Sequence, residues 1–518
     1  MKTIYFNGPI LTMEQELYAR AVLVEDGVIR KVGDAEEVLA LRTPDTEFVD
    51  LRGRVLLPAF IDPHSHITGL ANTLSTVSLE GVKTFEEILE RIEDYRREQN
   101  IPDGKWIIGF GYDHNLLQEK AHPDKTVLDR VCPGNPVVVS HASGHMGVMN
   151  SLGLQETGIN SDTPNPEGGV IGRGPDGKEP NGYLEETAFT RNAGKMPRPT
   201  LEDMCGLLEQ AQNIYLSHGI ATIQDGYTKD GEWQLLKKMA DDGRLKADVV
   251  AYIDLKDCRR ILQDHPEYQN SYRGHLKIGG YKIFLDGSPQ GRTAWMTSPY
   301  LGEDKNYCGY PIYQNEQVNK FMCTALEDGQ QILVHCNGDA AAQQMIDAYR
   351  SARHTVAGDI RPVMIHAQLV RPDQMPAMAE LSIIASFFVA HTYYWGDTHI
   401  KNFGMARAEK ISPVKSAAEN GVVYTFHQDT PVIQPDMLMT IWCAVNRKTR
   451  DGVSLDGGEK VTPLEALRGV TINAAYQYFE EDRKGSIREG KSADFVILDR
   501  EDVYKRQEQL RGRKEAGL

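Results

Sequence analysis

Six side chains that can bind metal ions occur in this 518-residue chain, each at or near the end of a short apolar run. If the runs are parallel strands of a barrel, their carboxyl ends meet at one mouth, where the active sites of such folds lie. Imidazole and carboxylate groups at one mouth are what a hydrolytic metal centre requires. The place of these side chains at the ends of apolar runs therefore predicts a hydrolytic metal centre. Its residues are His64, His66, Lys282, His335, His366 and Asp429.

The histidines come in two arrangements. His64 and His66 are separated by one residue, so on a strand both point to the same side, about 6.6 Å apart. Taken alone, this pair fits two solvated or hydrogen-bonded histidines equally well. His335 and His366 each end an apolar run; a single histidine there is more often a satisfied core residue, whereas two on successive strands favour metal binding.

Lys282 is unusual because alternation places it, Phe284 and Asp286 on the interior face of the run GGYKIFLDG. A buried ammonium group is costly, and a lysine with its ordinary pKa of about 10.4 is a poor metal ligand. Reaction with carbon dioxide gives a carbamate, an anion with two oxygens that can bridge two metals. The alternative is a structural ion pair with Asp286 or another acid.

Asp429 follows the run GVVYTFHQ and precedes Thr-Pro. A metal lowers the pKa of bound water from about 15.7 towards about 7, so that hydroxide can attack a carbonyl polarised by a metal. Asp429 is predicted to bind one metal and to carry the proton to the leaving amine. The alternative is an aspartate that shapes a turn before proline.

Polar residues in two other segments are predicted to contact the substrate. SHASGHMGVMN contains His141 and His145, and AHTYYWGDTH places aromatic residues among polar ones after the seventh predicted strand, as in a pocket with an apolar wall. Ordinary loop packing explains each residue equally well. The predicted substrate contacts are His145, Asp286, His391 and Trp395, of which His391 stands closest to a predicted strand end.

The elements that position these residues are eight apolar runs separated by helical patterns, the number of strands in a (β/α)8 barrel. The predicted fold is α/β: a distorted (β/α)8 TIM barrel over residues 56–469, with an insertion at about 67–210 that helps to roof the site. The predicted strands are 55–64, 219–226, 247–255, 279–287, 330–336, 361–367, 382–390 and 421–429.

The two ends of the chain are predicted to form a small β-sandwich domain from residues 1–55 and 470–500. Asp26-Gly27 between two alternating runs is a strong hairpin signal. Residues 501–518 read as a charged tail.

The net charge and composition of the chain limit the kinds of molecule that it is expected to bind. A net charge of −16 disfavours nucleic acid and anionic membranes, so a small-molecule substrate is expected. The N-terminal residues lack the apolar core of a signal peptide, and no run is long enough to span a membrane, so a cytoplasmic location is expected. The seven scattered cysteines predict no disulfide framework. A homodimer is a reasonable expectation.

The motifs PAFIDPHSH, GYDHNLL, SGHMGVMNS, YKIFLDGS, HCNGDAA and HQDTPV resemble the amidohydrolase superfamily, and within it amidohydrolase family 3, the YtcJ-like group. The resemblance implies metal-dependent hydrolysis of carbon–nitrogen bonds in a distorted barrel that carries a small β-sandwich. It also implies two metals, zinc first and manganese, iron or cobalt as alternatives. One metal would be held by His64, His66 and Asp429, the second by His335 and His366, with N-carboxylated Lys282 as the bridge. Family members usually continue beyond GKSADFVILD with further strands, whereas here a segment of about twenty residues rich in charge follows that motif.

The leading functional hypothesis is hydrolysis of an amide, such as an N-formyl or N-acyl amine. The first alternative is the same metal site acting on a cyclic amide, a lactone or another ester-like bond. Lys282 argues against deaminases that use one metal without a bridging lysine. The second alternative is a non-catalytic binding or scaffold barrel, which the full set of six ligand positions disfavours.

Overall fold

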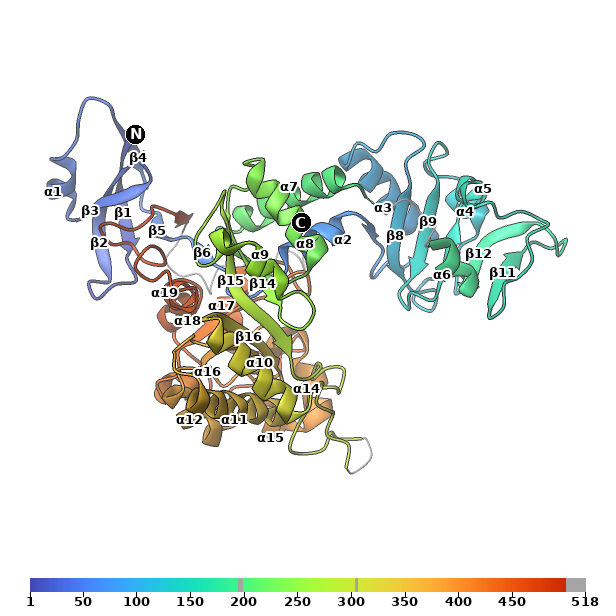
Figure 1. The fold of residues 1–518 in the computed structure, drawn as a ribbon. Helices are drawn as coiled ribbons and strands as arrows, with labels where there is room; N and C mark the ends of the chain where they lie inside the picture. Colours follow the sequence, from blue (N-terminus) through green and yellow to red (C-terminus); the bar gives the residue numbers. More distant parts are fainter. Residues whose placement is uncertain (194–198, 303–305, 500–518) are drawn as a thin grey trace. The chain divides into compact units, whose positions relative to one another are not determined.

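The computed structural model describes residues 1–193, 199–302 and 306–499. The chain forms two compact units, one from Met1–Thr68 with Glu209–Leu518 and the other from Gly69–Leu208 (Figure 1). None of the described helices is both long and apolar enough to cross a membrane. All seven cysteines are free thiols.

The first unit contains a curled parallel sheet whose eight strands follow one another in chain order. Every neighbouring pair is parallel. The strands are β6 (Phe60–Ile61), β13 (Ile220–Thr228), β14 (Asp248–Asp254), β15 (Leu276–Phe284), β16 (Gln331–Cys336), β17 (Val363–His366), β18 (Ile384–Phe387) and β19 (Tyr424–Phe426).

Two backbone hydrogen bonds join the segments that follow the first and the last strand of this sheet. The amide of Asp429 donates to the carbonyl of His64 at 3.1 Å, and the amide of His66 donates to that of Thr430 at 2.8 Å. The described residues show no ladder between β6 and β19 themselves. The sheet therefore curls far enough to bring its two end strands together at their carboxyl ends.

Helices connect the strands of this sheet and follow it. Their apolar faces are buried; Ala341, Met345 and Ala348 of α11 are examples. The helices are α7 (Leu201–Ser217), α8 (Asp230–Asp241), α9 (Arg260–Asp264), α10 (Asn315–Glu327), α11 (Asp339–Thr355), α12 (Met375–Glu380), α13 (His391–Tyr394), α14 (Gly396–Phe403), α15 (Met405–Ala408), α16 (Val414–Glu419), α17 (Met437–Asn446), α18 (Pro463–Gly469) and α19 (Ile472–Gln477).

Both ends of the described chain contribute to a second, six-stranded sheet of the first unit. Asp26 and Gly27 have φ angles of 51° and 75°, as a two-residue type I′ turn requires, and they join two antiparallel strands as predicted. The described residues form one sheet here, not two facing sheets, so the sandwich stays a prediction and the tail 501–518 lies outside the described residues. The elements are β1 (Lys2–Leu11), β2 (Tyr18–Glu25), β3 (Val28–Gly33), α1 (Ala35–Leu39), β4 (Thr46–Asp50), β5 (Val55–Pro58) and β20 (Phe495–Leu498).

The prediction of one strand over 55–64 was wrong. Val55–Pro58 pairs antiparallel with β20 of the terminal sheet, whereas Phe60–Ile61 pairs with β13 of the eight-stranded sheet. The amide of Ala59 donates to Asp494, and that of Phe60 donates to Gly219. The chain therefore changes sheets at Ala59 within one continuous apolar run.

The second unit has a six-stranded sheet in the order β11-β12-β10-β9-β8-β7. Pairs β7–β8 and β8–β9 are parallel and the others antiparallel. Its elements are α2 (Ile67–Leu74), which begins in the first unit, β7 (Val77–Ser78), α3 (Phe85–Glu98), β8 (Ile107–Tyr112), α4 (Lys125–Leu128), β9 (Val137–His141), β10 (Met146–Met149), α5 (Ser151–Thr157), β11 (Gly169–Arg173), β12 (Pro180–Glu186) and α6 (Thr187–Ala193).

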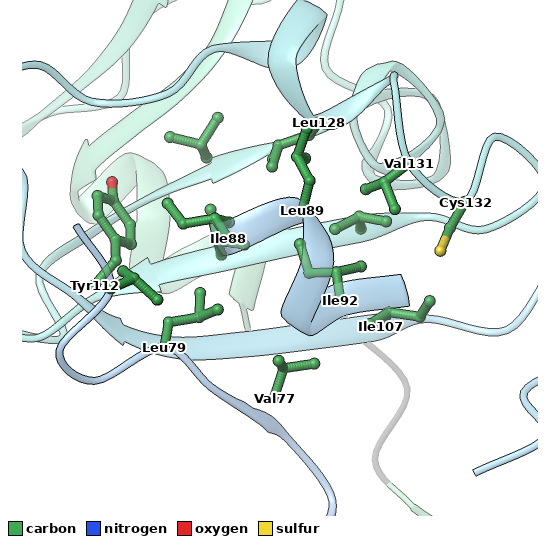
Figure 2. Packing of buried hydrophobic residues seen from close by; sticks show 14 of the residues in the cluster. Val77, Leu79, Ile88, Leu89, Ile92, Ile107, Tyr112, Leu128, Val131 and Cys132 are labelled. Atoms are coloured by element: carbon green, nitrogen blue, oxygen red, sulfur yellow. The ribbon is translucent and has the colours of Figure 1, made fainter. Parts of the chain in front are cut away.

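Helix α3 packs on this sheet through one apolar face. Thr84 caps the helix by accepting a hydrogen bond from the amide of Glu87, and Ile88, Leu89 and Ile92 are buried. Figure 2 shows these three side chains beside Val77 of β7, Ile107 of β8 and Leu79, which follows β7, with Leu128 and Val131 in the same cluster. The unit thus has a hydrophobic core of its own.

Candidate metal centre

The six predicted ligands all lie in the first unit, on the strands of the curled sheet or just beyond them. His64 and His66 follow β6, and Lys282 lies near the end of β15. His335 and His366 lie at the ends of β16 and β17, and Asp429 follows β19. Because all of these strands are parallel, their carboxyl ends share one edge of the sheet.

Three of the six side chains converge closely enough to bind one metal ion. Asp429 Oδ1 lies 3.4 Å from His64 Nε2 and 3.3 Å from His66 Nε2, and the three ligand atoms lie within 4.8 Å of one another. His64 is buried, and His66 is partly exposed. Two imidazole nitrogens and one carboxylate oxygen are a donor set typical of zinc sites.

Gln224 of β13 orients the His64 ring, a role that the sequence did not reveal. Its Oε1 lies 2.6 Å from His64 Nδ1, while its Nε2 donates to the carbonyl of Pro63 at 2.6 Å and so fixes which way the amide faces. His64 Nδ1 therefore carries the proton, and the lone pair of Nε2 points towards the cluster. A Cβ atom on Gly226 would lie 2.6 Å from His64 Cε1, so only glycine leaves room for the ring.

Lys282 is fully buried and points to the interior, as alternation predicts. Its Nζ lies 3.3 Å from His64 Nε2 and 5.0 Å from the centre of the Phe284 ring. Within the described residues it makes no ion pair, because the Asp286 carboxylate accepts instead from the backbone amides of Trp295, Asn337 and Gly338. Burial lowers the pKa of Lys282 from 10.5 to about 7.

His335 and His366 lie beside each other, with ring centres 4.5 Å apart. His335 Nδ1 is 3.3 Å from Asp286 Oδ1 but has no hydrogen-bond partner in the described part of the chain. His366 Nε2 lies 3.9 Å from Asp429 Oδ2, a looser approach than in the group of His64, His66 and Asp429. The structure thus brings His335 and His366 together next to that group without closing a second set of ligand distances.

His427, which the sequence did not single out, supports the other face of His366. Its Nε2 lies 3.2 Å from His366 Nδ1, and its Nδ1 lies 2.8 Å from Ser386 Oγ. This leaves His366 Nε2 free to face Asp429. His427 directly follows β19 and His366 ends β17, with β18 between these two strands, so the contact could be found only once the strand order and register were known.

The surroundings at this edge keep His64, His366 and His427 neutral and Asp429 charged. Burial lowers the pKa of His64 and His366 well below the ordinary value, and that of His427 to about 3. Burial alone would raise the pKa of Asp429, but the hydrogen bond with His66 and the nearby histidines hold it well below its usual value. Neutral imidazole and ionised carboxylate are the forms that bind metals.

Two of these residues have left-handed backbone conformations. His366 has a φ of 74° and Asp429 a φ of 53°, values uncommon for residues other than glycine. The amide of Asp429 is also held by the carbonyl of His64. Such strained positions cluster at functional sites because surrounding structure must enforce them.

The four residues predicted to contact the substrate lie in different surroundings, and two of them, His391 and Trp395, lie beside Phe388. Phe388 connects His391 and Trp395 to the centre, since its ring lies 4.6 Å from His391, 5.8 Å from Trp395 and 6.1 Å from His366. His391 is buried, and its Nδ1 lies 3.0 Å from His399 Nε2.

The other two predicted substrate residues have partners of their own. Asp286 is buried, and both of its carboxylate oxygens accept hydrogen bonds from backbone amides. These bonds hold the loop beside His335. His145 lies in the second unit, exposed, with Nδ1 3.0 Å from Glu186 Oε2. His145 thus belongs to a different unit from the six-residue cluster, and its contact with substrate stays a prediction.

Comparison with known proteins agrees with this geometry. The sequence pattern of the amidohydrolase family matches residues 47–514. N-substituted formamide deformylase of Arthrobacter pascens is 30% identical over 506 residues, which cover 94% of this chain and 91% of that protein. The putative amidohydrolase YtcJ of Bacillus subtilis strain 168 is 28% identical, covering 96% of this chain and 94% of that one.

A solved structure shows the same fold. The crystal structure of an uncharacterized metal-dependent hydrolase from Pyrococcus furiosus superposes with a TM-score of 0.77 at 26% identity, covering 97% of this chain and all of that chain. The chain belongs to the amidohydrolase family.

Proposed function

We propose that this protein is a metal-dependent hydrolase that cleaves the carbon–nitrogen bond of a small amide, an N-formyl or N-acyl amine. The observation that carries the proposal is the convergence of His64, His66 and Asp429 beside a buried Lys282 that makes no ion pair in the described residues. Family membership supports a hydrolase, and the 30% identical relative named a formamide deformylase supports the choice of bond.

The donor set fits two divalent transition metals, with zinc first. His64, His66 and Asp429 would hold one, and His335 and His366 the other. The orphaned Nδ1 of His335 and the Nε2 atoms aimed at Asp429 are the features that fit such ions. When bound, the metals would supply Lewis-acid activation of water and of the substrate carbonyl.

Lys282 is proposed to bridge the metals as a carbamate. Its neutral amine adds to the carbon of carbon dioxide and loses one proton, which leaves an anion with two oxygens. A pKa of about 7 makes much of the amine neutral at physiological pH, which this reaction requires. Burial without an acidic partner is otherwise costly for a lysine.

The chain's own groups then have separate tasks. Asp429, ionised and in contact with His66, is proposed to take a proton from the attacking water and pass it to the leaving amine. His391 and Trp395, whose rings lie beside Phe388, are proposed to contact the substrate. Asp286 is proposed to position His335.

The details of the fold, the binding partners, the cellular location and the oligomeric state are also part of the proposal. We infer that the curled sheet is a distorted (β/α)8 barrel, and that the terminal sheet is one half of a small β-sandwich. A small-molecule substrate, no nucleic-acid or membrane partner, a cytoplasmic location and a homodimer complete the proposal.

The test is a substrate screen with the full chain reconstituted with zinc or manganese. Formamides, N-acyl amines, cyclic amides and lactones are incubated with wild type and Asp429→Asn, and the released amine and acid are quantified. The proposal expects amine release from a formamide or N-acyl amine that chelators abolish and Asp429→Asn loses. Turnover only of lactones or cyclic amides would favour the alternative bond, and metal-loaded protein inert on every class would contradict the hydrolase assignment.

A further inference from the structure

A second cluster of metal-capable side chains lies within the unit Gly69–Leu208. Asp113 and His114 directly follow β8, and His141 ends the neighbouring strand β9. These strands are parallel, with Tyr112 opposite His141. The three side chains therefore meet at the carboxyl edge of two adjacent parallel strands, a location that favours ligand sites in α/β sheets.

The ligand atoms form a small, closed triangle. His114 Nδ1 lies 3.3 Å from His141 Nε2, and Asp113 Oδ1 lies 3.5 Å from His141 Nε2 and 3.8 Å from His114 Nδ1. A triangle with sides of 3.3, 3.5 and 3.8 Å has a circumscribed radius of about 2.1 Å. One point near the plane of the three atoms is thus about 2.1 Å from each, matching zinc–nitrogen and zinc–oxygen distances of about 2.0–2.2 Å.

The surroundings of the cluster also suit a cation. The amide of Asn115 donates a hydrogen bond to the Asp113 carboxylate at 2.9 Å. His122 stacks on His114 with ring centres 4.1 Å apart. Among the described residues, the Asp113 carboxylate faces the two histidine side chains and forms no ion pair with a lysine or arginine.

Ser143 holds the far side of the His141 ring. Its Oγ lies 2.9 Å from His141 Nδ1, and its amide donates to the same nitrogen at 3.1 Å. Without a metal, that amide favours the tautomer with the proton on Nε2, which can donate to Asp113. A metal requires a lone pair on Nε2, so its binding needs the other neutral tautomer, in which Nδ1 carries the proton and donates a hydrogen bond to the hydroxyl of Ser143 while the hydrogen bond from the Ser143 amide is lost.

We propose that Asp113, His114 and His141 bind a divalent transition metal of the zinc type, separate from the centre at His64. Three protein ligands leave one tetrahedral position open, and Asp113 and His114 are both about 30% exposed, so solvent reaches that side. A bound water or an anionic group of a ligand would complete the coordination. The competing explanation is a hydrogen-bonded triad without a metal.

The test uses the full chain stripped with a chelator and titrated with Co²⁺, whose visible absorption reports nitrogen and oxygen ligands, and with Zn²⁺ followed by elemental content. Wild type is compared with His141→Ala and with the isosteric Asp113→Asn. His145→Ala is the control, because His145 is an exposed histidine of the same unit paired with Glu186.

Each ligand variant is expected to bind one equivalent fewer than wild type, with affinity for that equivalent lowered by at least about 100-fold. The control should keep it, and circular dichroism should be unchanged. Lys282→Ala should retain this equivalent, which distinguishes it from the metals at the His64 centre. Equal equivalents in wild type and Asp113→Asn, or the same loss in His145→Ala, would overturn the proposal.

Discussion

Replacing Lys282 with methionine tests two things separately: the free-energy cost of burying the amine, and the role of the amine in metal binding and hydrolysis. Methionine has a similar length and no charge, and the site around Lys282 Nζ contains the Phe284 ring and His64 Nε2. The loaded variant is expected to lose one metal per chain and most of its hydrolytic activity, because no carbamate can form. The metal-free variant is expected to be more stable than wild type at low pH.

The magnitude follows from the pKa of Lys282, which falls from 10.5 to about 7 on folding. At about 1.36 kcal/mol per pKa unit, the protonated amine is disfavoured in the folded state by on the order of 5 kcal/mol. Between pH 7 and 10.5 the unfolded chain binds more protons, so wild-type stability rises with pH in this window. The free energy of unfolding of the methionine variant should therefore exceed that of wild type by the full amount below pH 7, and the difference should vanish towards pH 10.5.

The assay is urea unfolding of chelator-treated protein in carbon-dioxide-free buffer at several pH values, with metal content and turnover measured on loaded protein. Lys246→Met, a change at an exposed lysine of the same unit, is the matched control and should show no pH-dependent difference. A stability difference for Lys282→Met that does not change with pH would refute the buried-amine argument. Two metals and wild-type turnover in the same variant would refute the carbamate.

Three other substitutions test separate parts of the structure. Asp429→Asn should lower kcat by about 10²–10⁴-fold with little change in KM, as steady-state kinetics would show; an unchanged kcat would remove its role in proton transfer. Gln224→Leu should weaken metal binding by about 10–100-fold in a competition titration, because His64 loses the partner of Nδ1; wild-type affinity would contradict that orientation. Ile92→Ala should destabilise the unit Gly69–Leu208 by about 2–5 kcal/mol in denaturant titration, whereas Glu90→Ala on the exposed face of the same helix should change little.

Much of the sheet could be predicted from the sequence, because each apolar run is short and bounded by helical patterns. The runs gave the eight parallel strands in chain order. The error at Ala59 has a physical cause: an apolar run indicates burial but not which sheet its amides pair with. Only the hydrogen bonds from Ala59 and Phe60 to residues far along the chain reveal the change of sheet.

The site was predictable to the extent that its residues end strands. Gln224 and His427 were missed because each is a single polar residue near an apolar run, and its task depends on the register of a neighbouring strand. Asp286 shows the reverse problem. Alternation places its side chain towards the interior, yet backbone amides of the loops after β15 and β16 occupy the carboxylate, which only the structure reveals.

The charge balance of the six residues gives a reason for a lysine at position 282. Asp429 is the one carboxylate among the six, and burial keeps His64 and His366 neutral. Two divalent cations beside one carboxylate would leave three uncompensated positive charges in a buried place, which is strongly unfavourable. With the proposed function, a carbamate on Lys282 would replace a weak ligand with an anion and compensate one of those charges. Carbon dioxide and metal should therefore each raise the affinity of the site for the other, and by the same factor, since the coupling between two bound ligands is reciprocal.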